Sequence, residues 1–163
     1  MPEIIFAINP GSTTTKAALF WRDKCVFEQN LSHSAAELAP YQTIAAQLPM
    51  RLTAVETTLA AAIAAADLSG PAVVTAFVGR GGLVHPVPSG VYQVNDAMCD
   101  DLKQARYGEH ASNLGALIAS VLSKRYSSQA YIVDPVVVDE LEPVARLTGL
   151  PEIRHRSVFH ALN

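Results

Sequence analysis

The sequence predicts an α/β domain built on a mixed sheet, with an antiparallel meander at its N-terminal end and helices flanking the sheet. Three observations predict this class. Short apolar strands follow one another at the start, a long segment carries an apolar stripe of helical period, and later apolar runs are rich in β-branched residues. With 163 residues, 50% of them hydrophobic and 17% charged, the chain is long enough to bury a core.

The first predicted elements are three strands joined by tight turns, at residues 3–8, 16–22 and 25–31. Apolar residues then recur every three or four positions from Ile44 to Ile63, which predicts a helix that ends before Pro71. Pro49 lies within this stripe, and we expect it to kink the helix or divide it in two.

The rest of the chain alternates between strands and helices. The expected elements are a buried strand at residues 72–78, a short strand at 91–94, helices at 95–106 and 111–125, a strand at 130–133, an extended segment at 136–138, a short helix at 139–147 and a helix that begins at Ser157. Asn95 is the expected N-cap of its helix. Asp139 and Glu140 are interpreted as first-turn charges that complement a helix dipole.

Composition narrows the class of protein. The net charge of −3 gives no reason to expect a nucleic-acid partner. Cys25 and Cys99 lack the spacing of metal ligands, and we interpret them as buried or half-buried thiols in a reducing compartment. The chain start has no basic segment, and the longest apolar stretch, residues 59–66, is too short to cross a bilayer. We therefore expect a soluble, cytoplasmic protein without a membrane partner.

The turn in INPGSTTTKAALF is unusually rich in groups that can bind an anion. Hydroxyls at residues 12–15, backbone N–H groups and the Lys16 cation can surround phosphate oxygens. It is not a P-loop, because Thr15 precedes Lys16 where that motif requires Gly. The alternative is a Thr-rich hairpin whose hydroxyls only satisfy the turn itself.

Polar residues follow buried strands at three places, namely Asn9, Arg80 and Asp134. Ligands of open α/β sheets lie at the carboxyl ends of strands, so these side chains are candidates for one site. Arg80, within FVGRGGLVHP, offers a planar fork for a carboxylate or phosphate, while the alternative is an ion pair with a nearby acid. Asp134 could hold a metal-bound water or orient a substrate.

The histidines are weaker candidates when taken singly. His110, in GEHASNLGA, could donate a hydrogen bond to an anion, although a capping role is the simpler interpretation. His85 precedes a proline and is interpreted as structural. His160 lies near the end of RHRSVFHALN, after a basic cluster at residues 154–156 that is interpreted as a solvated face.

Five segments in this order resemble the acetokinase family, and within it the butyrate kinases, over essentially the whole chain: INPGSTTTK, FVGRGGLVHPVPSGVY, GEHASNLGA, IVDPVVVDE and RHRSVFHALN. The resemblance implies an actin-like ATPase domain of the ribonuclease H-like type. It also implies a kinase that converts ATP and butanoate to ADP and butanoyl phosphate with Mg²⁺, by direct in-line transfer to the carboxylate.

The resemblance also implies roles for individual residues. The implied phosphate- or ATP-binding residues are Asn9, Ser12, Thr14, Lys16 and His110. Arg80 corresponds to the arginine that binds the substrate carboxylate, Asp134 to the catalytic aspartate and His160 to a histidine that steadies the transferring phosphoryl group. Asn9 and Asp134 are the expected Mg²⁺ ligands, directly or through water.

The resemblance covers only the N-terminal domain of that family, so residues 1–163 are expected to be one domain of a longer protein whose C-terminal domain is absent. Alone, this domain should be almost inactive and should expose apolar surface, which could drive homodimer formation. Two alternatives remain open. One is a kinase for acetate, propionate or branched-chain acids, and the other is a non-catalytic nucleotide- or phosphate-binding module.

Overall fold

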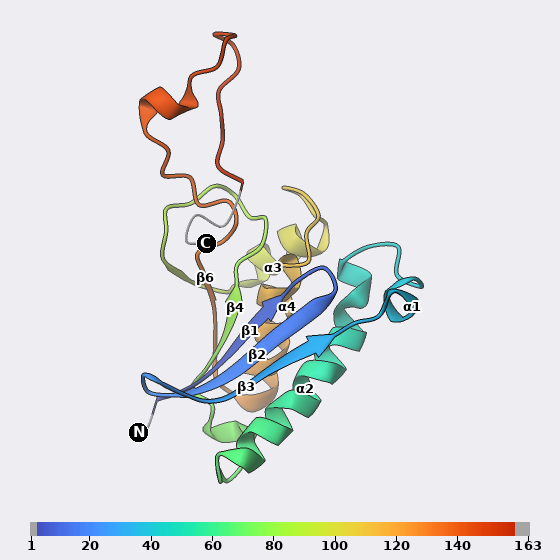
Figure 1. The fold of residues 1–163 in the computed structure, drawn as a ribbon. Helices are drawn as coiled ribbons and strands as arrows, with labels where there is room; N and C mark the ends of the chain where they lie inside the picture. The colour runs from blue at the N-terminus through green and yellow to red at the C-terminus, as the bar shows by residue number, and fades with distance from the viewer. Residues whose placement is uncertain (1–2, 159–163) are drawn as a thin grey trace.

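A six-stranded mixed sheet with two long helices on one face forms the body of the protein (Figure 1). The computed structural model describes residues 3–158. The strands are β1 (Ile4–Pro10), β2 (Thr14–Trp21), β3 (Lys24–Ser32), β4 (Ala76–Arg80), β5 (Val91–Gln93) and β6 (Gln129–Val133). The helices are α1 (Ala35–Leu38), α2 (Leu48–Ala65), α3 (Asp96–Lys103) and α4 (Asn113–Tyr126), with 3₁₀ turns η1 (Ala45–Gln47), η2 (Pro71–Val73) and η3 (Pro143–Arg146). Within the described part of the chain, no helix combines the length and apolarity needed to cross a membrane.

The strand order is β3-β2-β1-β4-β6-β5. The first three strands form the predicted antiparallel meander, and β1, β4 and β6 run parallel to one another. The short edge strand β5 is antiparallel to β6. Because β1, β4 and β6 are parallel neighbours, the residues that follow them emerge at the same edge of the sheet.

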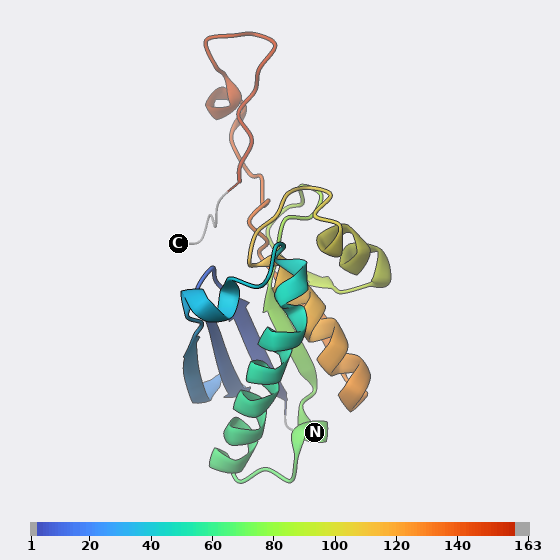
Figure 2. The same cartoon turned by 90° about the vertical axis from the view of Figure 1, so that its right-hand side faces the viewer.

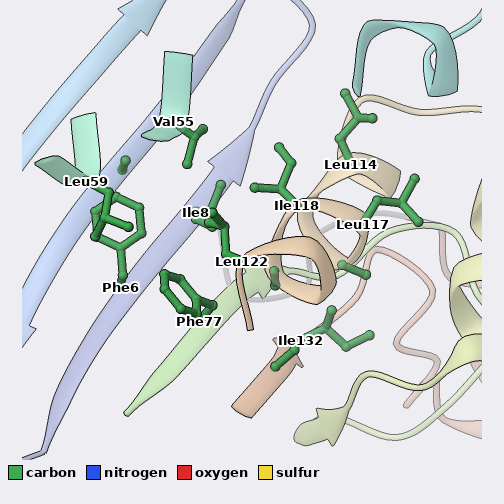
Figure 3. Close-up of a cluster of buried hydrophobic side chains, with 14 of the residues drawn as sticks. Phe6, Ile8, Val55, Leu59, Phe77, Leu114, Leu117, Ile118, Leu122 and Ile132 are labelled. Atoms are coloured by element: carbon green, nitrogen blue, oxygen red, sulfur yellow. The ribbon is translucent and has the colours of Figure 1, made fainter. Parts of the chain in front are cut away.

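Helices α2 and α4 lie side by side on one face of the sheet (Figure 2). Side chains alternate along β1, so Phe6 and Ile8 are fully buried toward the helices, whereas Asn9 is only half-buried on the opposite face. Figure 3 shows the helix-side core, in which Leu59 of α2 and Ile118 of α4 meet these strand residues. No described helix packs on the other face of β1 and β2, and that face is available for a site.

Glycines bring α4 into backbone contact with β4. A Cβ atom placed on Gly79 would lie 2.4 Å from the carbonyl carbon of Gly115, and one placed on Gly115 would lie 2.5 Å from the carbonyl oxygen of Arg80. Any side chain at either position would push the helix away from the strand. This contact fixes the first turn of α4 beside the end of β4.

Several predicted elements need correction. Pro49 neither kinks nor divides the helix: it lies in the first turn of α2, where its missing N–H has no helical partner to lose. The strand predicted at 72–78 is shorter, because η2 occupies its start and β4 begins at Ala76. Residues 136–137 form a turn rather than an extended segment, closed by Val138 N, which donates to Pro135 O (2.9 Å); Val138 itself makes an isolated parallel β-bridge with Val87.

Residues 139–158, here called the arm, project from the body (Figures 1 and 2). The helix predicted at 139–147 is wrong, because η3 is the only helical turn described in this segment. The two acids interpreted as its first-turn charges instead bind specific side-chain and backbone groups. Asp139 pairs with Arg146 (2.8 Å), and Glu140 accepts hydrogen bonds from Ser89 N (2.8 Å) and Ser89 Oγ (2.6 Å). These interactions lower the pKa of both carboxyl groups.

Other predictions about individual side chains have mixed outcomes. Asn95 caps α3 as predicted, accepting from Met98 N at 2.8 Å. Cys99 is buried, but Cys25 is exposed on the edge strand β3, so the prediction for Cys25 is wrong. The basic cluster at residues 154–156 is exposed, as predicted. The helix predicted from Ser157 lies mostly outside the described residues, and Ser157 itself is not helical.

Candidate functional site

The uncovered face of the sheet contains a hollow of about 590 Å³ at the ends of β1, β4 and β6, here called the sheet hollow. Four polar side chains singled out in the sequence line it together: Asn9, Lys16, Arg80 and Asp134. Ala7, Ala18, Val78 and Val133 provide apolar walls from the same strands. Asn9 and Asp134, which are 125 positions apart in the sequence, therefore converge on one concave surface.

Sheet register explains this convergence. Asn9 is paired with Lys16 across the antiparallel β1–β2 ladder, and Arg80 is paired with Val133 across the parallel β4–β6 ladder. Partners in register place their side chains on the same face of a sheet. Because Phe6 and Ile8 point toward the helices, Asn9 and its partner Lys16 point into the sheet hollow.

The backbone holds Asp134 in an unusual conformation at the end of β6. Its φ of 40° is in the left-handed region, which Asp tolerates better than most residues. Its Oδ1 accepts from Gly90 N (2.8 Å), and its own N–H donates to Gly90 O (3.1 Å). These two hydrogen bonds fix the carboxylate at the rim of the sheet hollow.

The glycines around Arg80 allow neighbouring backbone segments to pack closely against the loop that carries it. A Cβ on Gly81 would lie 2.6 Å from Pro135 Cβ, and a Cβ on Gly82 would lie 2.6 Å from Asn113 Cα. Together with the Gly79–Gly115 contact, they let β4, α4 and the segment after β6 meet at one point. The loop that carries Arg80 is therefore braced on both sides.

The turn at residues 10–15 divides its hydroxyl groups between two environments. Thr15 is buried, and its Oγ1 lies 2.9 Å from His33 Nε2, so this hydroxyl serves the fold. Ser12 and Thr13 are exposed, and Thr14 is half-exposed. Ser12 and Thr14 do not line the sheet hollow, but they belong to the turn that leads into Lys16.

His110 does not line the sheet hollow either. It lies on the loop before α4, where Ser112 N donates to its Nδ1 at 3.2 Å. A ring nitrogen that accepts a backbone N–H carries no proton, so Nε2 is the donor of the neutral ring. Asn113 Oδ1, which accepts from Leu83 N (2.9 Å), ties this loop to the residues after Arg80. His160 lies outside the described residues.

Sequence reasoning missed Arg51, which is fully buried beneath the turn. Its guanidinium donates to the carbonyl oxygens of Gly11 (2.8 Å), Ser12 (2.8 Å) and Thr14 (2.9 Å). The available signal was its spacing, because Arg51 follows Leu48 by three residues and precedes Val55 by four, on the apolar stripe of α2. A charged residue on the buried face of a helix needs a partner inside the protein.

Burial beside Arg51 also affects His33. Desolvation first, and the nearby Arg51 charge second, lower the pKa of His33, with a smaller opposing effect from Glu37. Arg51 Nη1 donates to Thr15 Oγ1 (3.1 Å), which itself lies 2.9 Å from His33 Nε2, so the Thr15 hydroxyl links the two side chains.

Oxygen donors for a metal are few. Between residues 3 and 158, no group of three or more His, Cys, Asp or Glu side chains could hold a metal ion. Asn9 and Asp134, which both line the sheet hollow, present one amide and one carboxylate. Mg²⁺ is commonly bound by one or two carboxylates together with water and substrate phosphates, so these residues fit that ion and do not form a complete cage.

Comparison with known proteins reveals close relatives in sequence. The chain is 49% identical over 159 residues to a probable butyrate kinase of Coprothermobacter proteolyticus, covering 98% of this chain and 43% of that protein. It is 46% identical over 160 residues to butyrate kinase 1 of Clostridium acetobutylicum, with the same shares covered. The chain thus spans less than half the length of these relatives. No family model matches it.

The fold has a solved counterpart. Acetate kinase from Porphyromonas gingivalis superposes on 97% of this chain with a TM-score of 0.62, at 12% sequence identity, and 45% of that kinase is covered. This similarity confirms the expected fold class, a mixed sheet of the actin-like ATPase type. Over the residues that it spans, the chain is therefore related in sequence to the butyrate kinases of the acetokinase family and has the fold of the matching part of an acetate kinase.

Proposed function

We propose that this chain is the N-terminal domain of a carboxylate kinase that transfers the γ-phosphoryl group of ATP to butanoate. The observation that carries the proposal is the convergence of Asn9, Lys16, Arg80 and Asp134 on the sheet hollow. The similarity to proteins named butyrate kinase supports the choice of reaction. The short coverage of those relatives supports a second domain and little activity of this chain alone.

In the proposed reaction, a carboxylate oxygen of butanoate attacks the γ-phosphorus, the bond from phosphorus to the ADP oxygen breaks, and ADP leaves with the electron pair. The attacking oxygen is already ionised, so no general base is needed. Catalysis then depends on positioning and on stabilising charge at the transferring phosphoryl group. Arg80 would bind the butanoate carboxylate with its planar fork, and Lys16 would neutralise phosphoryl oxygens.

The remaining residues would support these two cations. Ser12, Thr14 and the Nε2–H group of His110 would donate hydrogen bonds to phosphate oxygens from the rim of the site. Asp134 and Asn9 would hold Mg²⁺, directly or through water, and this ion would screen the charge of the phosphates when bound. His160 is proposed to steady the phosphoryl group. We further propose that the protein acts in the cytoplasm.

The length of the acyl chain is the least constrained part of the proposal. Acetate, propionate and branched acids carry the same carboxylate, so Arg80 alone does not distinguish them. A non-catalytic module that binds phosphate would use the same turn and Lys16 without needing Arg80. These alternatives therefore make different predictions for substrate range and for an Arg80 variant.

The test uses a fusion, here called the joined kinase, of this chain with the part of the Coprothermobacter proteolyticus relative that the chain does not cover. Acyl phosphate formation from ATP and each acid is measured by trapping with hydroxylamine. We expect activity to be highest with butanoate. Arg80→Ala should lower kcat/KM for butanoate by about 100-fold, because a charged hydrogen-bonding partner is lost. Arg106→Ala, at an exposed position after α3 that does not line the sheet hollow, is the matched control and should leave activity unchanged.

Each contrary result has a distinct meaning. If phosphotransfer is faster with acetate, propionate or a branched acid, that acid and not butanoate is the substrate. Binding of ATP by the joined protein without any acyl phosphate would favour the non-catalytic module. Full activity of Arg80→Ala would refute the assigned carboxylate site.

A further inference from the structure

We propose that Arg51 is a positioning residue that gives the turn at residues 10–15 its anion-binding form. The inference rests on the proposed function for the nature of the anion, but the geometry comes from the turn alone. From the helix side, Arg51 binds carbonyl oxygens of the turn and thereby aims backbone N–H groups away from the protein. The ligand class is the terminal phosphate groups of a nucleoside triphosphate, for which inorganic pyrophosphate is a simple probe.

The carbonyl groups of the turn are all bound inside the protein. Arg51 Nη1 binds the carbonyl oxygens of Gly11 and Thr14, and Arg51 Nη2 binds that of Ser12. The fourth carbonyl oxygen, on Thr13, accepts from His33 N at 2.8 Å. Four consecutive carbonyl oxygens therefore have internal donors.

The backbone N–H groups of the turn point in the opposite direction. In a trans peptide, the N–H of one residue points away from the carbonyl of the residue before it. Since the carbonyls of Gly11 and Ser12 point toward Arg51, the N–H groups of Ser12 and Thr13 point away from it. Neither N–H has an acceptor among the described residues. Successive N–H groups in an exposed turn form the kind of concavity that binds anions.

The charge of Arg51 strengthens the effect. Its side chain is fully buried, and none of the ion pairs between residues 3 and 158 includes it. Carbonyl oxygens and Gln47 Oε1, which accepts from Arg51 Nε at 3.0 Å, satisfy its hydrogen bonds but do not neutralise its charge. An uncompensated buried cation is costly, and an anion bound on the outer side of the turn would offset part of that cost.

Lysine cannot take over this role. Arginine offers five donors in a rigid fork, whereas lysine offers one flexible ammonium group. Arg51→Lys therefore keeps the charge but cannot hold three carbonyl oxygens and the Gln47 side chain together. This variant separates the geometric role of the guanidinium from its charge, and Arg125→Lys on the exposed side of α4 is the matched control.

The test titrates the chain itself with inorganic pyrophosphate and follows backbone amides by NMR. In the wild type, the amide signals of Ser12 and Thr13 should shift the most. Arg51→Lys should weaken pyrophosphate binding at least about tenfold at a temperature well below its unfolding transition, and Arg125→Lys should not. In the joined kinase, Arg51→Lys should raise KM for ATP while leaving KM for butanoate unchanged.

A purely structural Arg51 would give a different result, since the unfolding temperature would fall while the affinity for pyrophosphate stayed the same. That outcome would overturn the proposal. If Arg51→Lys fails to fold, the wild-type titration still tests the proposal. Amide signals of Ser12 and Thr13 that do not shift at saturating pyrophosphate would refute it. Turn binding that depends on Arg51, in a joined protein that makes no acyl phosphate, would instead refute the proposed reaction and leave this inference standing.

Discussion

Replacing Gly79 with alanine tests the backbone contact that positions α4 beside Arg80. The new Cβ would lie 2.4 Å from the Gly115 carbonyl carbon, 2.5 Å from its oxygen and 2.9 Å from its Cα. Carbon atoms in good contact are about 3.5–4.0 Å apart, so α4 would have to move by about 1 Å. Both partners are backbone, and no side-chain rotation can relieve the overlap.

That displacement would loosen the packing of α4 on the sheet. Leu114, Ile118 and Leu122 are fully buried there, and a gap of 0.5–1 Å forfeits about a quarter to a half of each contact energy. Overpacking of a core typically costs about 1–3 kcal/mol, and this site should be near the upper end. For a domain of this size, about 3 kcal/mol corresponds to a fall of about 6–12 °C in unfolding temperature.

Thermal unfolding followed by circular dichroism, with urea titration for the free energy, provides the measurement. Gly149→Ala is the control, because a Cβ there meets no atom within 4 Å, and its unfolding temperature should stay close to the wild-type value. An unfolding temperature of Gly79→Ala equal to that of wild type would refute the argument that the two backbones are in obligatory contact.

Two further predictions concern His33 and Asp134. Burial lowers the pKa of His33 below its ordinary value of 6.5, so the unfolded chain binds a proton that the folded chain does not. The free energy of unfolding should therefore fall as the pH drops below about 6.5, and His33→Asn should flatten this dependence in urea titrations at several pH values; an unchanged slope would contradict it. Asp134→Asn should keep the left-handed backbone and unfold close to wild type, whereas Asp134→Ala should lose about 1 kcal/mol or more. Both substitutions should abolish phosphotransfer in the joined kinase. An active Asp134→Asn variant would refute the proposed role of Asp134 in holding Mg²⁺.

Local sequence patterns were sufficient for most of the fold. Short apolar runs separated by tight turns predicted the meander, and the apolar run at residues 130–133 predicted β6, because these signals lie within a few residues. The effect of Pro49 was predicted wrongly because the apolar stripe begins before it, at Ile44, so that Pro49 resembles a residue in a helix interior. The sequence does not show that the α-helix itself begins only at Leu48. Residues 139–147 were wrongly predicted as a helix, because the contact of Glu140 with Ser89, which lies far away in the sequence, could not be foreseen from local residues.

The site was only partly predictable. Strand-end positions identified Asn9, Arg80 and Asp134, since parallel strands bring their carboxyl ends together whatever the details of packing. The importance of Arg51 depends on contacts with carbonyl oxygens about 40 residues away, and carbonyl groups leave no mark in a sequence. Likewise, the glycines after β4 suggested close approach, but only coordinates identify α4 and Pro135 as the approaching parts.

The arm has a practical consequence for anyone who handles this chain. Nine large apolar side chains are exposed within the described residues, and five of them lie on the arm: Val144, Leu147, Leu150, Ile153 and Val158. Exposed apolar side chains that cluster on the arm promote association between molecules as the protein concentration rises. Serine or lysine substitutions on the arm, which lies apart from the sheet hollow, are the natural means of keeping concentrated samples monodisperse for the titrations.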